Sequence, residues 1–439
     1  MWMSFHAISG QAPSRCLLPS SKTQDRNKGN GVIWLAPSSA WSLTARLTVM
    51  MTEKLGISSD HDTPQFYLDG DIYPFAWGRE TPSTPIDAER LPSLDYALHL
   101  FQIVRFRLGQ AYRLFEEESF VARIHEFYVD GLDKRSAKSD FWFIQFLMVI
   151  ALGNAFTSRN RCQKDPPGSK YFARAMSAMP NYTSTGKDSL LAIEALALVG
   201  LYLYALDHRE AAHLHLGHAI RIAQMEGMHT QLPEDALGAV TVARCQNIWW
   251  SLYTMDRQFS PSVGLPMTTK DNDITTLISL PTSRPRDLTF NLQVRLTRML
   301  SFIISTIYKT DKTHIGEFLD ITREILEKMA KYAEEIEKMI HVNFHGSMDN
   351  IPEETRYTIL LYHQCVIIAT RPLLLSVLKE RLEKLGRAVE DWQKFLALPR
   401  SLISIGIKSA SKVLQIIGDE NDPLGAMFFF ASFSSPGHY

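Results

Sequence analysis

Hydrophobic residues recur along most of this chain at intervals of three and four positions, the spacing that places them on one face of a helix. The clearest apolar stripe lies within residues 244–259 and consists of Cys245, Ile248, Trp249, Leu252 and Phe259. Trp250 cannot share the face of Trp249, so it needs a second apolar surface. The pattern therefore predicts a central helix with neighbours on two sides. The residues that should stop this helix and form a tight turn are Pro261, Gly264 and Pro266.

The same period predicts a series of further helices. They lie at residues 96–116, 120–127, 141–156, 170–179, 189–206, 211–226, 288–308, 315–340, 355–379, 388–396 and 401–417. Gly227 follows one of them in the position of a C-terminal cap. No run alternates at period two over the length of a strand. The sequence therefore predicts an all-α fold, a large multi-helix bundle-like domain over residues 94–435.

The helix at residues 315–340 carries Lys and Glu opposite a long apolar stripe. Such a charged face is expected to be solvated, and a coiled-coil partner is the alternative. Thr322 interrupts the stripe, and a buried threonine can bond back to its own helix.

The first part of the chain has a different texture. Residues 1–60 are rich in Ser, Thr, Pro, Gly and Asn, keep no period, and are expected to be a disordered or wrongly assigned segment. Six basic residues face three acidic ones there, which is expected to be solvated chain, with a nucleic-acid-binding arm as the alternative. Residues 61–93 are rich in proline and aromatic residues and predict an extended lead-in.

Composition narrows the class of protein. The 439 residues are 45% hydrophobic and 21% charged, as in a soluble globular protein with ample core. A formal net charge of −1 gives no global attraction to nucleic acid or to an anionic membrane. The longest apolar run, residues 141–156, is shorter than a membrane span and predicts a buried helix, so we expect no membrane contact.

The cysteines and histidines do not predict a metal site. Four cysteines are too far apart to clamp a metal, which indicates reduced core residues of an intracellular protein: Cys16, Cys162, Cys245 and Cys365. Four histidines lie close together, and a zinc site is the alternative to packing or surface roles: His208, His213, His215 and His218.

Searches for catalytic motifs also give nothing. There is no glycine-rich phosphate loop, no nucleophile elbow and no His-Glu-x-x-His sequence. The nearest approach to an aspartate-rich metal motif, Asp271 with Asp273, falls in a predicted turn. We therefore expect no catalytic residue, no metal ligand and no enzyme. A helical-repeat scaffold and an all-α enzyme are the rival classes, and neither a repeat period nor an acid–base pair supports them.

Two linked segments, residues 216–229 and 244–274, together resemble a signature of the fungal-specific transcription factor domain. In that family the first segment is followed by Arg-x-x-x-Trp-Trp-x-x-Tyr-x-x-Asp-Arg, a Gly-x-Pro turn and an acidic Asp-x-Asp-Ile. The matching positions are Gly217, Arg221, Gly227, His229, Arg244, Trp249, Trp250, Tyr253, Asp256, Arg257, Gly264, Pro266, Asp271, Asp273 and Ile274. Arg244 stands one residue further from the Trp pair than in the family pattern. Residues 360–364 with Arg371 and Pro372 are similar to a later helix, so the resemblance covers roughly residues 90–420.

The resemblance implies the regulatory middle region of a zinc binuclear cluster transcription factor. Such factors are fungal nuclear proteins that regulate RNA polymerase II-dependent metabolic or secondary-metabolite genes. The resemblance also implies modulation by a small-molecule effector, a coregulator or a homo- or heterodimer partner, with DNA contacted elsewhere. The signature residues are expected to be structural. Asp256 and Arg257, charges in an apolar setting, are expected to fix helix packing by pairing with buried groups.

The zinc module of the family is not encoded here. It needs six cysteines with two Cys-x-x-Cys pairs, and this chain has only Cys16 before residue 90. We therefore expect no zinc cofactor and no direct DNA binding by this chain. Either the gene product is truncated, which the apolar run at residues 428–433 also favours, or it is a regulator that partners a complete factor. Inter-helix space near the Trp pair is the expected effector site.

Overall fold

The computed structural model describes most of the chain from Leu91 onward. The described residues are Leu47, 91–109, 111–129, 140–158, 165–180, 189–278, 285–308, 315–344, 353–384 and 397–418. All regular structure in them is helical, which confirms the predicted all-α class. The segments expected at residues 1–60 (Leu47 apart) and 61–90, the helix expected at 388–396 and the run at 428–433 lie outside the described residues.

The helices follow one another in the order that the apolar period predicts. They are α3 (Leu94–Leu108), α4 (Glu117–Val129), α6 (Phe141–Thr157), α7 (Ser169–Ser177), α8 (Ser189–Ala205), α9 (Arg209–Met225), α10 (Glu234–Leu237), α11 (Ala239–Val263), the 3₁₀ turn η4 (Asp271–Asp273), α12 (Pro285–Ile307), α13 (Ile315–Phe344), α14 (Glu353–Lys384) and α16 (Ala397–Gly418).

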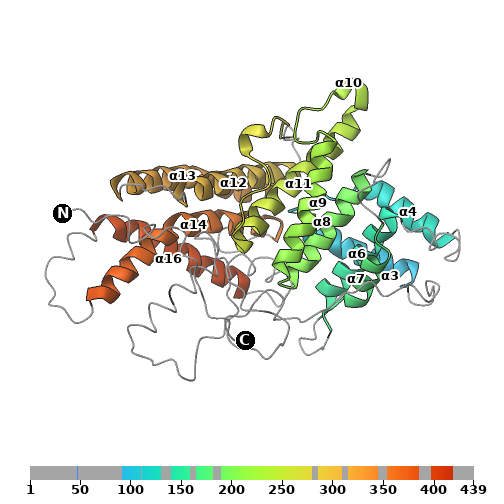
Figure 1. Cartoon of the computed structure of the whole chain (residues 1–439), viewed down its shortest axis with the longest axis horizontal. Helices are drawn as coiled ribbons and strands as arrows, with labels where there is room; N and C mark the ends of the chain where they lie inside the picture. Colours follow the sequence, from blue (N-terminus) through green and yellow to red (C-terminus); the bar gives the residue numbers. More distant parts are fainter. Residues whose placement is uncertain are drawn as a thin grey trace, which may run out of the picture.

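Helix α11 lies between two groups of helices (Figure 1). The helices from α3 to α9 form one apolar core with it, and α12, α13, α14 and α16 form a second core. α11 contacts α8 and α9 on one side and α12 on the other. Trp249 and Trp250 are each 1% exposed, which confirms that this helix is covered on two sides.

The first predicted helix is too long. α3 ends at Leu108, capped by Gly109, rather than at Glu116. The chain then crosses the side of α11 without helical structure: the backbone N–H of Arg113 donates to Ser251 Oγ (2.7 Å), and the hydroxyl of Tyr112 donates to Gln258 Oε1 (2.7 Å). Ala111 fits the apolar spacing of the preceding helix but does not belong to it. It is apolar because it is buried in this crossing segment.

The predicted end of α11, at Phe259, is four residues too early, but the prediction that Gly264 stops this helix is confirmed. The helix continues through Pro261 to Val263 and ends at Gly264, whose φ of +80° is the left-handed conformation that glycine adopts without strain. The backbone N–H of Leu265 closes this end by donating to the carbonyl of Ser260 (2.8 Å). Pro261 removes only its own N–H bond, and the residues on either side of it, Ser260 and Ser262, are buried.

Helix α13 shows the predicted division into two faces. Its apolar residues, among them Ile325, Met329 and Ile336, are buried in the second core. Exposed ion pairs such as Lys328 with Glu324 (2.7 Å) lie on the outside. Thr322 is buried and donates to the carbonyl of Phe318 (2.8 Å), which confirms the expected bond to its own helix.

Within the described residues, one helix is long and apolar enough to cross a membrane by length and composition, residues 355–378 of α14. In this structure 72% of its most apolar window is buried inside the protein. It packs on α12, α13 and α16, so it is a core helix of this fold.

Candidate functional site

The end of α11 and the loop after it are joined by a network of buried polar groups. We call this network the signature junction; its members are Tyr253, Asp256, Arg257, Thr268, Thr269 and Asp271. Asp256 is 0% exposed and Arg257 is 1% exposed, so neither charge is solvated. Charges this deeply buried need partners, and the loop supplies them.

Asp256 accepts hydrogen bonds from both sides. Its Oδ1 accepts from the hydroxyls of Ser260 (2.8 Å) and Thr268 (2.7 Å). Its Oδ2 accepts from the backbone N–H of Thr268 (3.0 Å) and from Arg257 Nη1 (2.8 Å). One carboxylate thus binds the last turn of α11 and the start of the loop.

Arg257 holds the loop further along. Its Nη2 donates to the carbonyl of Thr269 (2.6 Å) and to Asp271 Oδ1 (2.7 Å). The guanidinium carbon lies 3.7 Å from the ring centroid of Tyr253, and the Tyr253 hydroxyl donates to the same oxygen of Asp271 (3.0 Å). Tyr253 stays protonated because burial raises its pKa. These groups, some buried and some half-buried, are the partners that the sequence could not name.

The other half of the signature meets the same loop. Gln224 Nε2 donates to Thr269 Oγ1 (2.9 Å), and the backbone carbonyl of His229 accepts from the N–H groups of Thr275 (2.9 Å) and Thr276 (3.1 Å). The first signature segment therefore contacts the loop that follows α11, which is the end of the second segment.

The remaining signature residues have varied surroundings. Trp249 packs against His229, and Trp250 Nε1 donates to the carbonyl of Leu277 (3.0 Å). Gly227 has a φ of +73° and ends α9 as the predicted cap. Exposed or half-buried positions outside the junction are Gly217, Arg221, Pro266 and Asp273. Arg371 and Pro372 are buried within α14.

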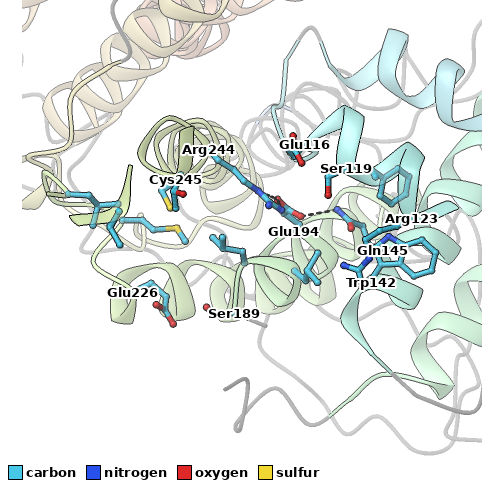
Figure 2. A pocket seen from close by; sticks show the side chains of 17 residues that line it. Glu116, Ser119, Arg123, Trp142, Gln145, Ser189, Glu194, Glu226, Arg244 and Cys245 are labelled. Atoms are coloured by element: carbon cyan, nitrogen blue, oxygen red, sulfur yellow. Dashed lines mark hydrogen bonds and ion pairs between the residues drawn. The ribbon is translucent and has the colours of Figure 1, made fainter. Parts of the chain in front are cut away.

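A cavity of about 410 Å³ lies next to these segments. Its polar lining comes from the ends of α9 and α11 and from α4, α6 and α8, and Figure 2 shows these side chains around it. Its polar lining residues are Glu116, Ser119, Arg123, Gln145, Ser189, Glu194, Glu226, Thr241 and Arg244. Its apolar and aromatic lining residues, with one cysteine, are Phe120, Trp142, Leu190, Leu191, Met228, Leu232, Leu237 and Cys245.

One buried carboxylate organises the wall of this cavity. Glu194 is 1% exposed and accepts from Arg244 Nη2 (2.8 Å) and Nε (3.2 Å) through Oε1. Its Oε2 accepts from Gln145 Nε2 (3.0 Å), as Figure 2 shows. Burial raises the pKa of Glu194 to about 7, although Arg244 and Gln145 oppose that shift and Glu116 adds to it. This carboxyl group therefore changes charge near neutral pH.

The cavity is displaced from the expected effector site. Its lining includes Arg244 and Cys245, one turn before the Trp pair, and neither Trp249 nor Trp250. Both indoles are packed into the core instead. The signal that sequence reasoning passed over is a lone polar residue inside a very apolar helix, Gln145 in α6 and Glu194 in α8.

The histidines and cysteines do not converge in the described residues, where no three metal-ligating side chains come together. His215 Nδ1 contacts the carbonyl of Ala211 and His218 Nδ1 that of Leu214, both at 2.8 Å, so each ring bonds to its own helix. Cys245 and Cys365 are buried free thiols in different helices. Four cysteines in the whole chain do not fit a six-cysteine zinc module.

Comparisons with known proteins point to one family. A family model described as the fungal specific transcription factor domain matches residues 110–393. The chain is 24% identical over 248 residues to an uncharacterised transcriptional regulatory protein of Schizosaccharomyces pombe, covering 53% of the chain and 31% of that protein. It is 18% identical over 284 residues to the thiamine repressible genes regulatory protein thi1 of the same yeast, covering 62% of the chain and 35% of the relative.

A third relative is the transcription factor FBD3 of Gibberella moniliformis, 24% identical over 200 residues that cover 44% of the chain and 26% of the relative. The alignments thus span only about a quarter to a third of the length of these relatives. No solved structure matches the chain.

Proposed function

The chain belongs to the fungal specific transcription factor domain family, and from this we propose that it regulates transcription through its helical domain. The observation that carries the proposal is the family match over residues 110–393, which contain the whole signature junction. The relatives named as transcriptional regulators support the same role. We further propose a nuclear location and target genes transcribed by RNA polymerase II in fungal metabolism.

In this proposal the helical domain modulates activity and does not itself contact DNA. The whole chain has a formal net charge of −1, which gives no overall attraction to a phosphate backbone. DNA recognition is assigned to a zinc module or partner protein outside these 439 residues. A mobility-shift assay with the purified chain is expected to show no sequence-specific complex, and a specific complex would contradict this assignment.

The experiment that tests the regulatory role is a reporter assay in yeast. The full chain is fused to an unrelated DNA-binding domain whose operator controls a reporter gene. The fusion is expected to change reporter output, up or down, relative to the DNA-binding domain alone at equal protein level. Unchanged output from a fusion that is present in the nucleus would overturn the proposal.

An enzymatic role has less support. The lining of the 410 Å³ cavity holds no histidine, so a serine–histidine pair for nucleophilic catalysis is not formed by its lining residues. The buried carboxylate Glu194 is already occupied by Arg244 and Gln145.

A further inference from the structure

One positive charge in the cavity has no counter-ion among the described residues. Arg123 of α4 is half-buried, and its guanidinium carbon lies 5.1 Å from the ring centroid of Trp142. Within the described part of the chain it makes no ion pair, whereas Arg244, the other arginine of the lining, pairs with Glu194. A half-buried guanidinium held on an aromatic ring is a ready site for a planar anion.

A second donor lies beside it. The indole Nε1 of Trp142 is buried and has no hydrogen-bond acceptor within the described residues, although the residue is only 5% exposed. A buried N–H group without an acceptor costs free energy, which a ligand oxygen would recover once the indole turns its N–H toward the cavity. Ser119 precedes Arg123 by one helical turn and also lines the cavity, so its hydroxyl adds a third donor.

The opposite walls limit the charge of a ligand. Glu116 and Glu226 line the cavity in addition to Glu194, so three carboxyl groups face two guanidinium groups. Phosphates and other multiply charged anions are disfavoured in such surroundings. A ligand with a single carboxylate can place that group on the donors near Arg123, and the uncharged rest of the ligand then lies near the acidic residues. In Figure 2, Arg123 and Trp142 lie at one end of the cavity, and Cys245 and Glu226 lie at the other.

The cavity also has apolar walls, since Leu190, Leu191 and Met228 are among its lining residues. Between its two ends, Figure 2 shows Ser189 and the pair of Glu194 with Arg244. A volume of about 410 Å³ is within the range of small-molecule sites in proteins.

We propose that this cavity binds a small monocarboxylic acid with an apolar body, its carboxylate on Arg123 and the Trp142 N–H. Binding would join α4 and α6 to the wall formed by Arg244 and Cys245, and so to the signature junction on the same helix. Regulation by such a ligand rests on the proposed function, whereas the binding itself does not.

The test uses the full chain and a set of ligands that share one phenyl ring. Isothermal titration calorimetry compares phenylacetate with phenylacetamide, phenethylamine, phenylalanine and benzylphosphonate, and hexanoate and octanoate test other bodies. Phenylacetate is expected to bind at least about tenfold more tightly than phenylacetamide, because the amide lacks the charge that strengthens the hydrogen bonds. Phenylalanine, which adds an ammonium group to the same ring and carboxylate, is expected to bind more weakly than phenylacetate. Arg123→Gln should weaken carboxylate binding by about tenfold or more and leave the amide unchanged.

Two further variants separate the site from a general loss of structure. Trp142→Phe keeps a ring and removes the N–H, and it should weaken carboxylate binding by a few-fold. Arg221→Gln changes an exposed arginine of α9 outside the cavity lining and should have no effect. Circular dichroism confirms that each variant is folded.

The outcomes decide the matter. The proposal would be overturned if phenylacetate and phenylacetamide bound equally well, or if no monocarboxylate bound at millimolar concentration. It would also be overturned if phenethylamine, phenylalanine or benzylphosphonate bound most tightly. The same compounds are then added to the reporter strain. Binding without a change in reporter output would leave the site intact and reject its regulatory role. An active reporter fusion without any binding in the calorimeter would reject the site alone.

Discussion

Arg257 and Asp271 form an ion pair of 2.7 Å in which the arginine is 1% exposed and the aspartate 32% exposed. The pair joins the last turns of α11 to a loop residue 14 positions later in the chain. Because Asp256 binds the same guanidinium from the other side, the charge of Arg257 is balanced entirely within the junction. The end of the central helix and the loop that faces α9 therefore depend on one another.

The first prediction concerns this dependence. Arg257→Met removes the buried cation and leaves Asp256 without its counter-charge. Breaking a buried pair in this way costs about 3–5 kcal/mol. Asp271→Asn should cost less, about 1 kcal/mol, because the partly exposed side chain keeps its hydrogen-bonding shape. Urea denaturation followed by tryptophan fluorescence measures both.

Asp273→Asn is the matched control for these variants. Asp273 lies two positions from Asp271, is exposed, and is expected to change the free energy of unfolding by less than about 0.5 kcal/mol. An Arg257→Met protein as stable as the wild type would show that the junction does not hold this part of the fold together.

The second prediction follows from Glu194. Its pKa is raised from 4.5 to about 7 in the folded chain, mainly by burial. The native state therefore keeps a proton that the unfolded state has released between these pH values. The free energy of unfolding should fall as the pH rises through this window, by up to about 1.4 kcal/mol per pH unit for this group. Glu194→Gln removes this titrating group, so the variant lacks its contribution to the pH dependence. The free energy of unfolding of the wild type should therefore fall relative to that of Glu194→Gln as the pH rises from about 4.5 to 7.

Urea denaturation at half-unit pH steps provides the comparison. Thr241→Ala is the control, because Thr241 lines the same cavity, is exposed and has no ionisable group. The stability difference between this variant and the wild type should stay flat over the same window. A flat difference for Glu194→Gln as well would show that the Glu194 carboxyl titrates at the same pH in the folded and the unfolded chain.

Most of this fold could be predicted from the sequence, because the apolar residues on the buried face of a helix recur at a regular spacing within the helix itself. The stripe of α13 and the Trp pair of α11 are examples. The prediction failed where contacts with a distant part of the chain decide the local structure. Ala111 continues the apolar spacing, yet the chain has left the helix there, and the next two residues, Tyr112 and Arg113, bond to Gln258 and Ser251 of α11.

The candidate cavity could not be predicted for the same reason. Glu194 and Gln145 are separated by 49 positions, and each stands alone in an apolar helix, so nothing local indicates that they bond to each other. The signature segments were visible because they are continuous in the chain. The partners of Asp256 and Arg257, in contrast, depend on how the loop folds back on the helix.

The third prediction compares two helix glycines. A Cβ atom at Gly217, a signature residue in α9, would meet nothing within 4 Å. Gly217→Ala should therefore stabilise the protein by about 0.5–1 kcal/mol, through the lower flexibility of the unfolded chain. A Cβ atom at Gly153 in α6 would lie 2.7 Å from the Cβ of Leu100 in α3. Gly153→Ala should cost about 1–3 kcal/mol, because two packed helices must separate.

Thermal unfolding of the two alanine variants gives opposite shifts of the midpoint if this is correct. A large loss of stability in Gly217→Ala would contradict the packing around α9. A loss of reporter activity without loss of stability would instead identify Gly217 as part of a contact surface.

The fourth prediction tests the link between the two cores. Gln258 of α11 accepts a hydrogen bond from Tyr112 (2.7 Å) and donates one to the hydroxyl of Tyr357 in α14 (2.6 Å). Gln258→Met removes both bonds from a buried site and should cost about 1–3 kcal/mol. Changing both tyrosines to phenylalanine in the same protein removes the polar groups together, so the triple variant should be more stable than Gln258→Met alone.

Urea denaturation of the wild type, the single variant, the double phenylalanine variant and the triple variant completes the cycle. A triple variant no more stable than Gln258→Met alone would mean that the three groups do not act as one hydrogen-bonded unit.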